Sequence, residues 1–165
     1  MVAGIAECLT SMTTFKKTAA ALTLSLGGVL FIQGWEGTKT TAYLDSVGVP
    51  TICTGSTRAV RIGQVADLQE CQERLVYDTG VSGRAVQRCV QAPVTQRQYD
   101  ALVSLGFNIG GGALCGSTLV RKLNSGDCRG AAQQFLRWDY AGKQRLRGLT
   151  KRRQAESAEF TKDCE

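Results

Sequence analysis

The sequence contains no histidine and only two prolines among its 165 residues. The absence of histidine excludes Ser-His-Asp triads and histidine-ligated metal centres, so carboxylates are the expected general acids and bases. The 19 glycines, set against two prolines, indicate many turns rather than a disordered chain. We therefore expect neither a metal ion nor a cofactor, and we look for chemistry among the Asp and Glu residues.

Cysteine, by contrast, is plentiful. The absence of any C-x-x-C pair argues against a zinc site and against thioredoxin-type chemistry. The wide spacing favours disulfides formed outside the cytoplasm. Because the number is odd, at least one thiol is unpaired or shared between alternative bridges, and the sequence does not choose among the pairings. The seven cysteines are Cys8, Cys53, Cys71, Cys89, Cys115, Cys128 and Cys164.

The formal net charge of +6 points to an anionic partner, such as nucleic acid, an anionic membrane surface or bacterial cell wall. Aromatic and basic residues do not alternate as they do in single-strand binders, so we do not expect nucleic acid as a partner. The length and the 43% hydrophobic content fit one domain with room for an N-terminal appendage. We expect a monomer.

The segment Thr18–Trp35 carries no charge and follows Lys16 and Lys17. As a helix, its 18 residues would span about 27 Å, close to a hydrocarbon core of about 30 Å. The lysines favour an orientation that places Glu36 and everything after it across the membrane. A cleaved signal peptide, a buried core helix and a permanent anchor compete as interpretations, although no small-x-small cleavage site follows and Gly, Ala, Ser and Thr dilute the apolar content. This weak hydrophobicity predicts a segment that lipid holds poorly.

The rest of the chain predicts short strands followed by helices. Two β-prone runs, 42–44 and 50–53, flank turn residues. Capping residues predict helices that begin after Asp67, Thr95 and Asp127. From residue 95 onward the pattern is all-helical, and no linker or repeat divides it. We therefore expect two parts, an N-terminal segment 1–34 and a single domain 35–165.

Apolar spacing sets the expected extent of these helices. The first helix has apolar residues at helical spacing from 68 to 76, and three glycines at 110–112 are expected to end the second. Leu136 and Trp138 are expected on the inner face of a later helix. The charged run 149–160 predicts the last one.

Glu36 precedes Asp45 by nine residues, and Thr51 follows six residues later. Glycoside hydrolysis needs one carboxylic acid to protonate the leaving oxygen, and a second carboxylate to orient water or to attack. A Glu beside Trp35 at the end of an apolar segment is suited to the first role, and an Asp in a polar turn to the second. Two solvated surface acids and a strand Thr are the alternative that this spacing leaves open.

The pattern Glu-x8-Asp-x5-Thr also resembles the catalytic signature of phage-type lysozymes, the endolysins of bacteriophages. The likeness continues, in the family's order, through residues 98–110, 116–124 and 131–156, and it covers the chain from 34 to 160. It implies an α+β, lysozyme-like fold with a small β-sheet lobe, a mostly helical lobe and an N-terminal apolar helix.

The resemblance implies hydrolysis of the β-1,4 bond between N-acetylmuramic acid and N-acetylglucosamine in peptidoglycan. By position, Glu36 is the general acid, Asp45 guides water or stabilises the oxocarbenium ion, and Thr51 positions the water. Arg152 falls where the family carries an arginine near the catalytic Glu. Inverting stereochemistry is what the family suggests. Two further positions match the family's substrate cleft: Phe107 and Gln134.

The chain departs from the family pattern just after Thr51. The family often has Gly-x-Gly-His there, whereas this chain has Cys53 at the first Gly position and Ser56 in place of the His. A thiol two residues from the catalytic Thr suggests a second control. We expect Cys8 and Cys53 as regulatory cysteines that change partners between two forms, with three fixed bridges and an idle Cys8 as the alternative.

Some endolysins resemble this chain in carrying a weakly hydrophobic N-terminal helix, the signal-anchor-release segment. The likeness implies a host inner-membrane tether through Thr18–Trp35, with an inactive periplasmic domain that is later released to the periplasm for lysis. Peptidoglycan strands are the expected substrate. Two other functions remain open: a lytic transglycosylase, which needs no Asp-Thr pair for water, and a non-catalytic cell-wall-binding protein.

Overall fold

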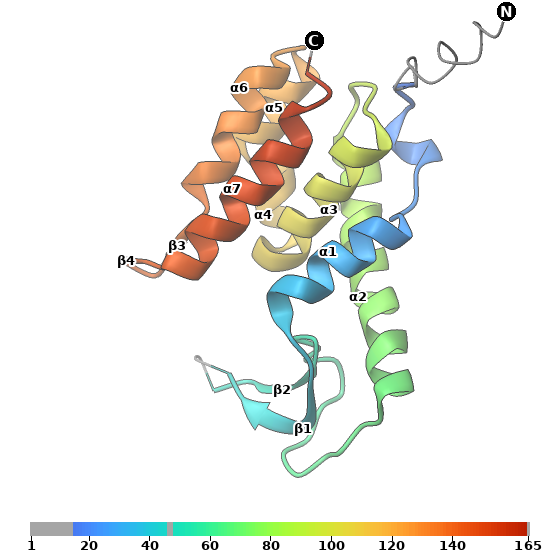
Figure 1. Cartoon of the computed structure of the whole chain (residues 1–165), viewed down its shortest axis with the longest axis vertical. Coiled ribbons are helices and arrows are strands. Elements are labelled where there is room, and N and C mark those ends of the chain that lie inside the picture. The colour runs from blue at the N-terminus through green and yellow to red at the C-terminus, as the bar shows by residue number, and fades with distance from the viewer. Residues whose placement is uncertain (1–14, 46–47, 165) are drawn as a thin grey trace, which may run out of the picture.

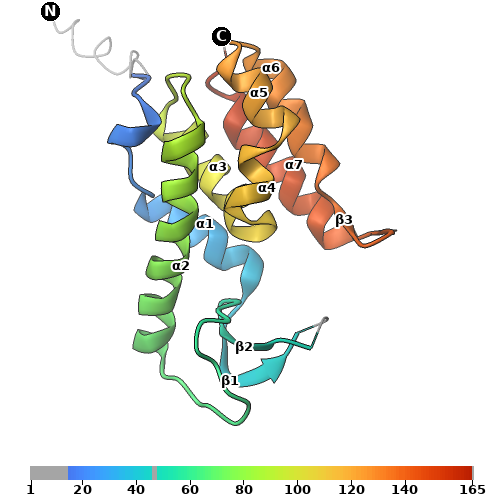
Figure 2. The same ribbon diagram turned by 180° about the vertical axis from the view of Figure 1, so that it is seen from behind.

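The computed structural model describes residues 15–45 and 48–164, which form a small β lobe and a larger helical lobe (Figure 1). Helix α2, Leu68–Cys89, begins beside the β lobe and runs up along the helical lobe, so it belongs to both (Figure 2). The predicted α+β, lysozyme-like class is confirmed. The predicted helix at 68–76 is longer than expected, because buried Thr79, Ser82 and Ala85 continue its inner face.

The β lobe is built on an antiparallel pair, β1 (Lys39–Leu44) and β2 (Pro50–Cys53). Tyr43 lies opposite Thr51, so the turn between the strands carries Asp45 at its start. The lobe has its own small core, formed by Ile52, Cys53, Ala66 and Cys71.

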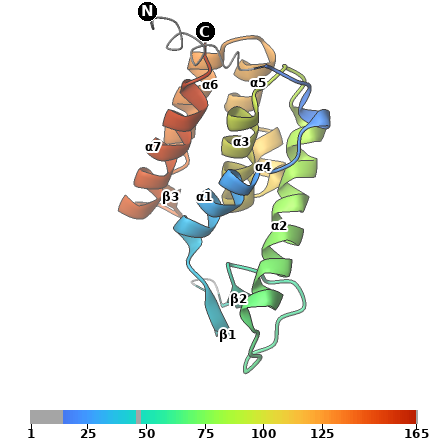
Figure 3. The same cartoon turned by 45° about the vertical axis from the view of Figure 1, so that its right-hand side comes forward.

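The helical lobe surrounds α3, Gln96–Ile109, whose residues from Gln98 to Gly106 are nearly all buried. Helix α1 crosses α3 between α2 and α7 (Figure 3). The remaining elements of the lobe are η1 (Ala19–Ala21), α1 (Leu26–Glu36), α4 (Gly111–Cys115), α5 (Thr118–Asn124), α6 (Cys128–Gln134), η2 (Phe135–Arg137) and α7 (Arg147–Thr161).

The predicted helix starts are confirmed. Asp67 accepts a hydrogen bond from the Glu70 N–H, and Asp127 accepts one from the Gly130 N–H, both at 2.8 Å. Thr95 and Gln98 form a reciprocal capping box at the start of α3. Each cap satisfies amide groups that the helix itself leaves unpaired.

The prediction of one apolar helix over Thr18–Trp35 is wrong for this structure. The segment forms the short turn η1, an extended stretch, and then α1. The break has one local and one distant cause: Ser25 caps α1 by accepting from the Gly28 N–H, and the Leu22 carbonyl accepts at 2.8 Å from the side chain of Gln87, 65 residues away. Ala19, Leu22 and Ile32 are buried in the core of the helical lobe.

No helix in the described part of the chain has both the length and the apolar character needed to cross a membrane. The expected boundary between 34 and 35 falls inside α1.

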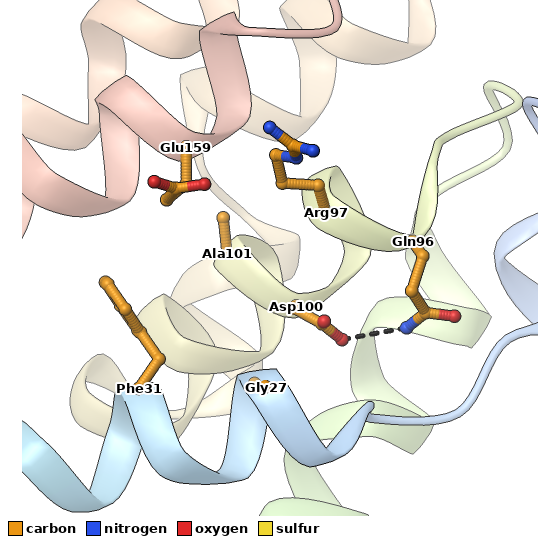
Figure 4. A pocket seen from close by; sticks show the side chains of 8 residues that line it. Gly27, Phe31, Gln96, Arg97, Asp100, Ala101 and Glu159 are labelled. Carbon is orange, nitrogen blue, oxygen red and sulfur yellow. Dashed lines mark hydrogen bonds between the residues drawn. The ribbon is translucent and has the colours of Figure 1, made fainter. Parts of the chain in front are cut away.

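Asp100 of α3 holds the start of α1 (Figure 4). Its carboxylate accepts from both the N–H and the hydroxyl of Ser25, the former at 3.1 Å. Gln96 donates to the same carboxylate at 2.8 Å and to the Thr23 carbonyl at 2.8 Å. Beside this contact, a cavity of about 540 Å³ opens between α1, α3 and α7, with Phe31 among its lining residues.

Three other details differ from the sequence predictions. The stretch after residue 95 is not all-helical, because Tyr140–Ala141 (β3) and Gln144–Arg145 (β4) form a small hairpin. Gly110 ends α3 with a positive φ of 87°, but the next two glycines begin α4 instead of a loop. Leu136 is 42% exposed, since the chain tightens into η2, whereas Trp138 packs against the core as expected.

Three disulfides connect the described cysteines: Cys53–Cys71, Cys89–Cys115 and Cys128–Cys164. The first ties β2 to the first turns of α2, and the third ties α6 to the end of the chain. Cys8 lies outside the described residues.

Candidate active site

Glu36 is the last residue of α1, and its side chain is 21% exposed. Gly37 follows with a φ of 67°, a left-handed conformation that favours glycine and that turns the chain sharply toward the β lobe. Trp35 packs edge-on against Phe31 one turn earlier, with ring centroids 6.1 Å apart. The end of α1 thus places Glu36 at the junction of the two lobes.

Arg152 of α7 donates from Nη1 to Glu36 Oε1, and its own side chain is only 4% exposed. The arginine that the family pattern places near Glu36 is therefore in direct contact with it. On the other side, the β lobe comes close: a Cβ built on Gly55 would lie 3.9 Å from Glu36 Oε2.

Asp45 and Thr51 lie on the turn and strand of the β lobe. Asp45 and Val49 form a closed turn, in which the Asp45 carboxylate accepts from the Val49 N–H at 2.8 Å. The buried Thr51 donates its hydroxyl proton to the Val49 carbonyl at 2.9 Å. Val49 therefore links the two side chains and fixes their positions relative to each other.

A groove of about 390 Å³ runs between the lobes, and both Glu36 and Phe107 line it. Sequence reasoning missed three polar residues in this groove, because they come from separate parts of the chain and form no motif: Arg58, Asp78 and Asn108.

Gln134 does not line this groove. It lies on the wall of a second hollow of about 320 Å³, together with Ser117, Arg137 and Trp138. The structure thus brings Glu36, Arg152 and Phe107 together and places Gln134 elsewhere on the helical lobe.

The departure from the family pattern at residues 53 and 56 has a structural counterpart. Cys53 adopts a φ of 60°, which a glycine takes without strain and other residues rarely adopt. Ser56 pairs with Ile52 through two backbone hydrogen bonds of 2.9 Å. Its hydroxyl is buried and has no hydrogen-bond partner among the described residues.

Behind Arg152 lies a buried group of charges. Glu156 is fully buried, accepts from the Ser104 hydroxyl at 2.6 Å, and pairs with both Arg152 and Arg153. Burial raises the pKa of the Glu156 carboxyl, against the opposing effect of Arg153. Burial also lowers the pKa of the Arg153 guanidinium, against the attraction of Glu156. Charges this deep persist only when they are paired.

Comparison with known proteins agrees with this geometry. The family described as Phage lysozyme matches residues 33–156. An endolysin of Acyrthosiphon pisum secondary endosymbiont phage 1 is 40% identical over 83% of this chain and 97% of its own length. The SAR-endolysin of Enterobacteria phage P21 is 37% identical over 75% of this chain and 76% of its own.

A solved structure is also similar. The muramidase domain of SpmX from Asticaccaulis excentricus is 33% identical, with a TM-score of 0.79 over 84% of this chain and 97% of that one. Sequence, fold and the groove that contains Glu36 thus agree, and the chain belongs to the phage lysozyme family, whose endolysins cleave peptidoglycan.

Proposed function

We propose that the chain is a muramidase that hydrolyses the β-1,4 bond between N-acetylmuramic acid and N-acetylglucosamine in peptidoglycan. The observation that carries this proposal is the position of Glu36, which lines an open groove between the lobes with one carboxylate oxygen held by Arg152. The similarity to a muramidase domain supports the choice of bond.

In this mechanism Glu36 gives its proton to the glycosidic oxygen as the bond to the anomeric carbon breaks. A water molecule attacks that carbon from the other face, and Asp45 takes the proton that the water loses. Thr51 holds the water. The hydrogen bonds of Asp45 and Thr51 to Val49 support these roles, since both side chains are held by the same residue.

Substrate contacts follow from the two hollows. Phe107 shares the groove with Glu36 and would pack against a sugar next to the bond that is cleaved. Gln134 would contact substrate only where a glycan strand of peptidoglycan, or the peptide attached to that glycan, extends to the hollow beside Trp138.

The test compares the purified chain with Glu36→Gln on isolated Gram-negative peptidoglycan, with release of soluble fragments as the measurement. We expect at least a ~10³-fold loss, because the variant has no acid to donate. Mass spectrometry of the products separates the alternatives: hydrolysis adds a water, whereas a transglycosylase leaves an anhydro end. Binding to the wall without cleavage by the unaltered chain would refute the proposal.

Thr51 provides a matched pair of variants. Thr51→Val keeps the shape of this buried side chain and removes its hydroxyl, whereas Thr51→Ser keeps the hydroxyl. We expect Thr51→Val to lose most of the turnover and Thr51→Ser to keep much of it. Asp45→Ala with full activity would favour a transglycosylase.

We also propose that the enzyme is first exported in a tethered, inactive form and later released to the periplasm. In the tethered form, residues 1–34 would be the anchor and residues 35–165 the catalytic domain. The likeness to a SAR-endolysin supports this, as does the mixed composition of Thr18–Trp35. In the folded form α1 ends at Glu36, so a segment still in lipid would leave Glu36 without this helix to place it. We expect the released enzyme to act as a monomer.

The tether can be strengthened without disturbing the fold. Thr23, Gly27 and Gly34 are exposed, and a Cβ on Gly34 would have nothing within 4 Å. Replacing all three by Leu should keep the enzyme in the membrane fraction after depolarisation, while the detergent-extracted protein keeps its activity. Replacing them by Ala is the control. Equal release of both variants would argue against an anchor.

The cysteine switch is a further part of this proposal. On release, the thiolate of Cys71 would attack the Cys53 sulfur of a Cys8–Cys53 bridge and release Cys8 as a thiolate, so that Cys53–Cys71 replaces the bridge of the tethered form. Disulfide mapping of membrane and soluble fractions tests this exchange. Identical pairings in the two fractions would exclude it.

A further inference from the structure

Arg152 lies between two carboxylates. Its Nη1 donates to Glu36, and its Nε donates to Glu156 Oε1 at 3.1 Å. A second terminal nitrogen, Nη2, donates to the Ser104 carbonyl at 3.3 Å. The guanidinium is therefore held on three sides, and only one of its partners is the proposed acid.

Glu156 is the buried one of the two carboxylates that bind Arg152. It is 0% exposed, it lies one turn after Arg152 on α7, and the Ser104 hydroxyl and Arg153 Nη2 also donate to its Oε1, at 2.6 and 2.8 Å. Burial raises the pKa of the Glu156 carboxyl, and the two guanidinium groups and the hydroxyl oppose that rise. Because helix geometry fixes the i, i+4 pair, Glu156 sets where Arg152 points.

We propose that Glu156 is a positioning residue for the hydrolysis: it holds Arg152 in place and shares its positive charge, so that the guanidinium that binds Glu36 does not have Glu36 as its single carboxylate partner. This inference rests on the proposed role of Glu36 as general acid. A guanidinium with a single carboxylate partner favours the ionised form of that carboxylate, which has no proton to donate. Glu156 gives Arg152 a second carboxylate partner and offsets that effect.

Other charged groups around Glu36 are few. Helix α7 contributes Arg152 and the next residue, Arg153. The groove contributes Arg58 from the β lobe and Asp78 from α2. The proposed partner, Asp45, lies on the β1–β2 turn. Glu156 itself faces its two arginines on α7, and α3 presents to it the uncharged Ser104. Of these groups, only Glu156 contacts both the guanidinium that binds Glu36 and a further cation.

The decisive measurement is the pH profile of kcat/KM for Glu156→Gln. Gln has the same shape and can still accept from Arg152, but the negative charge is gone. We expect the alkaline limb of the profile to move to lower pH by about one unit, as the loss of a nearby buried charge implies. The matched control is Glu159→Gln, which makes the same charge change on the same helix at a residue paired only with Lys162. If kcat/KM falls at every pH and the alkaline limb stays at the same pH, Glu156 has a structural role only, and the proposal is overturned.

A second measurement needs no variant, so it decides the matter even if Glu156→Gln does not fold. Carboxyl ¹³C NMR of the glutamate-labelled wild-type enzyme follows both groups directly. We expect Glu156 to be ionised over the pH range of the kcat/KM profile. A neutral Glu156 in that range would overturn the proposal, because it could share no charge. If the wild-type enzyme fails to cleave peptidoglycan at all, the proposed function fails instead, and the NMR result still stands.

Discussion

Asp100 accepts hydrogen bonds from both the backbone N–H and the hydroxyl of Ser25, the residue that caps α1. Ser25 and Asp100 are 75 residues apart in sequence, so a contact with the central helix supports the local cap in which Ser25 accepts from the Gly28 N–H. Glu36 lies at the other end of the same helix. The Ser25–Asp100 contact therefore fixes one end of the element that places the proposed acid at the other.

We expect Asp100→Asn to destabilise the enzyme. The variant keeps the size of the side chain but weakens two hydrogen bonds to Ser25, so the free energy of unfolding should fall by about 1–2 kcal/mol. Urea denaturation followed by circular dichroism measures this change. Glu73→Gln, at an exposed residue whose carboxylate accepts from the Gln69 side chain, is the control and should leave stability within experimental error.

Two glycines of α1 should respond in opposite directions to the same substitution. A Cβ on Gly28 would lie 2.6 Å from Leu24 Cδ1 and 2.8 Å from Asp100 Cγ, so Gly28→Ala must displace a neighbour. We expect a loss of about 1–3 kcal/mol. Gly34→Ala meets nothing within 4 Å and should gain about 0.5–1 kcal/mol from helix propensity. Thermal melts of the two variants check this, and equal shifts would contradict the packing of α1.

The β3–β4 hairpin should show a pH-dependent stability. The Arg145 guanidinium, which donates to Asp139 at 2.5 Å, lowers the pKa of this buried carboxyl, and Thr150 also donates to it. A lowered pKa means that the stabilisation is present above the unfolded pKa and is lost as the pH falls through the folded value. Asp139→Asn should therefore lower the Tm at pH 7, and the difference should shrink below about pH 4. If the difference in Tm between Asp139→Asn and the wild type stays constant down to pH 3, the ion pair between Asp139 and Arg145 is contradicted.

The disulfides should differ in what their removal does to activity. Replacing Cys128 and Cys164 by Ala opens a loop of 36 residues and should cost roughly 3–4 kcal/mol of stability. This bridge lies away from the groove, so kcat well below the Tm should be retained. Replacing Cys53 and Cys71 by Ala should also reduce kcat, since Cys53 is two residues from Thr51. Melting curves and turnover at 20 °C below each Tm separate the two effects.

Local signals predicted much of the helical lobe. The caps at Asp67, Thr95 and Asp127 depend on residues only three positions apart, and all three are present in the structure. The same holds for the last helix, whose charged run begins within two residues of the observed start of α7. Features that a few neighbouring residues determine could be predicted from the sequence.

Features that depend on contacts between residues far apart in the chain could not be predicted from the sequence. The break in Thr18–Trp35 depends on Gln87 and Asp100, which no pattern near the segment reveals. The β3–β4 hairpin is held by Asp139 and Arg145 in a stretch with no strand periodicity. The sequence predicted a charged helix over 149–160, but it did not show that α7 buries Glu156 between Arg152 and Arg153.

The left-handed backbone at Cys53 bears on the order in which the Cys53–Cys71 pair arose. Without a partner at position 71, a cysteine at position 53 would cost about 1–2 kcal/mol in backbone strain and bring no bond in return. A cysteine at position 71, on a regular helix, carries no such cost. If Cys71 was present first, the later change to Cys53 formed the disulfide at once and stabilised the fold. In the reverse order, the protein with Cys53 alone is less stable.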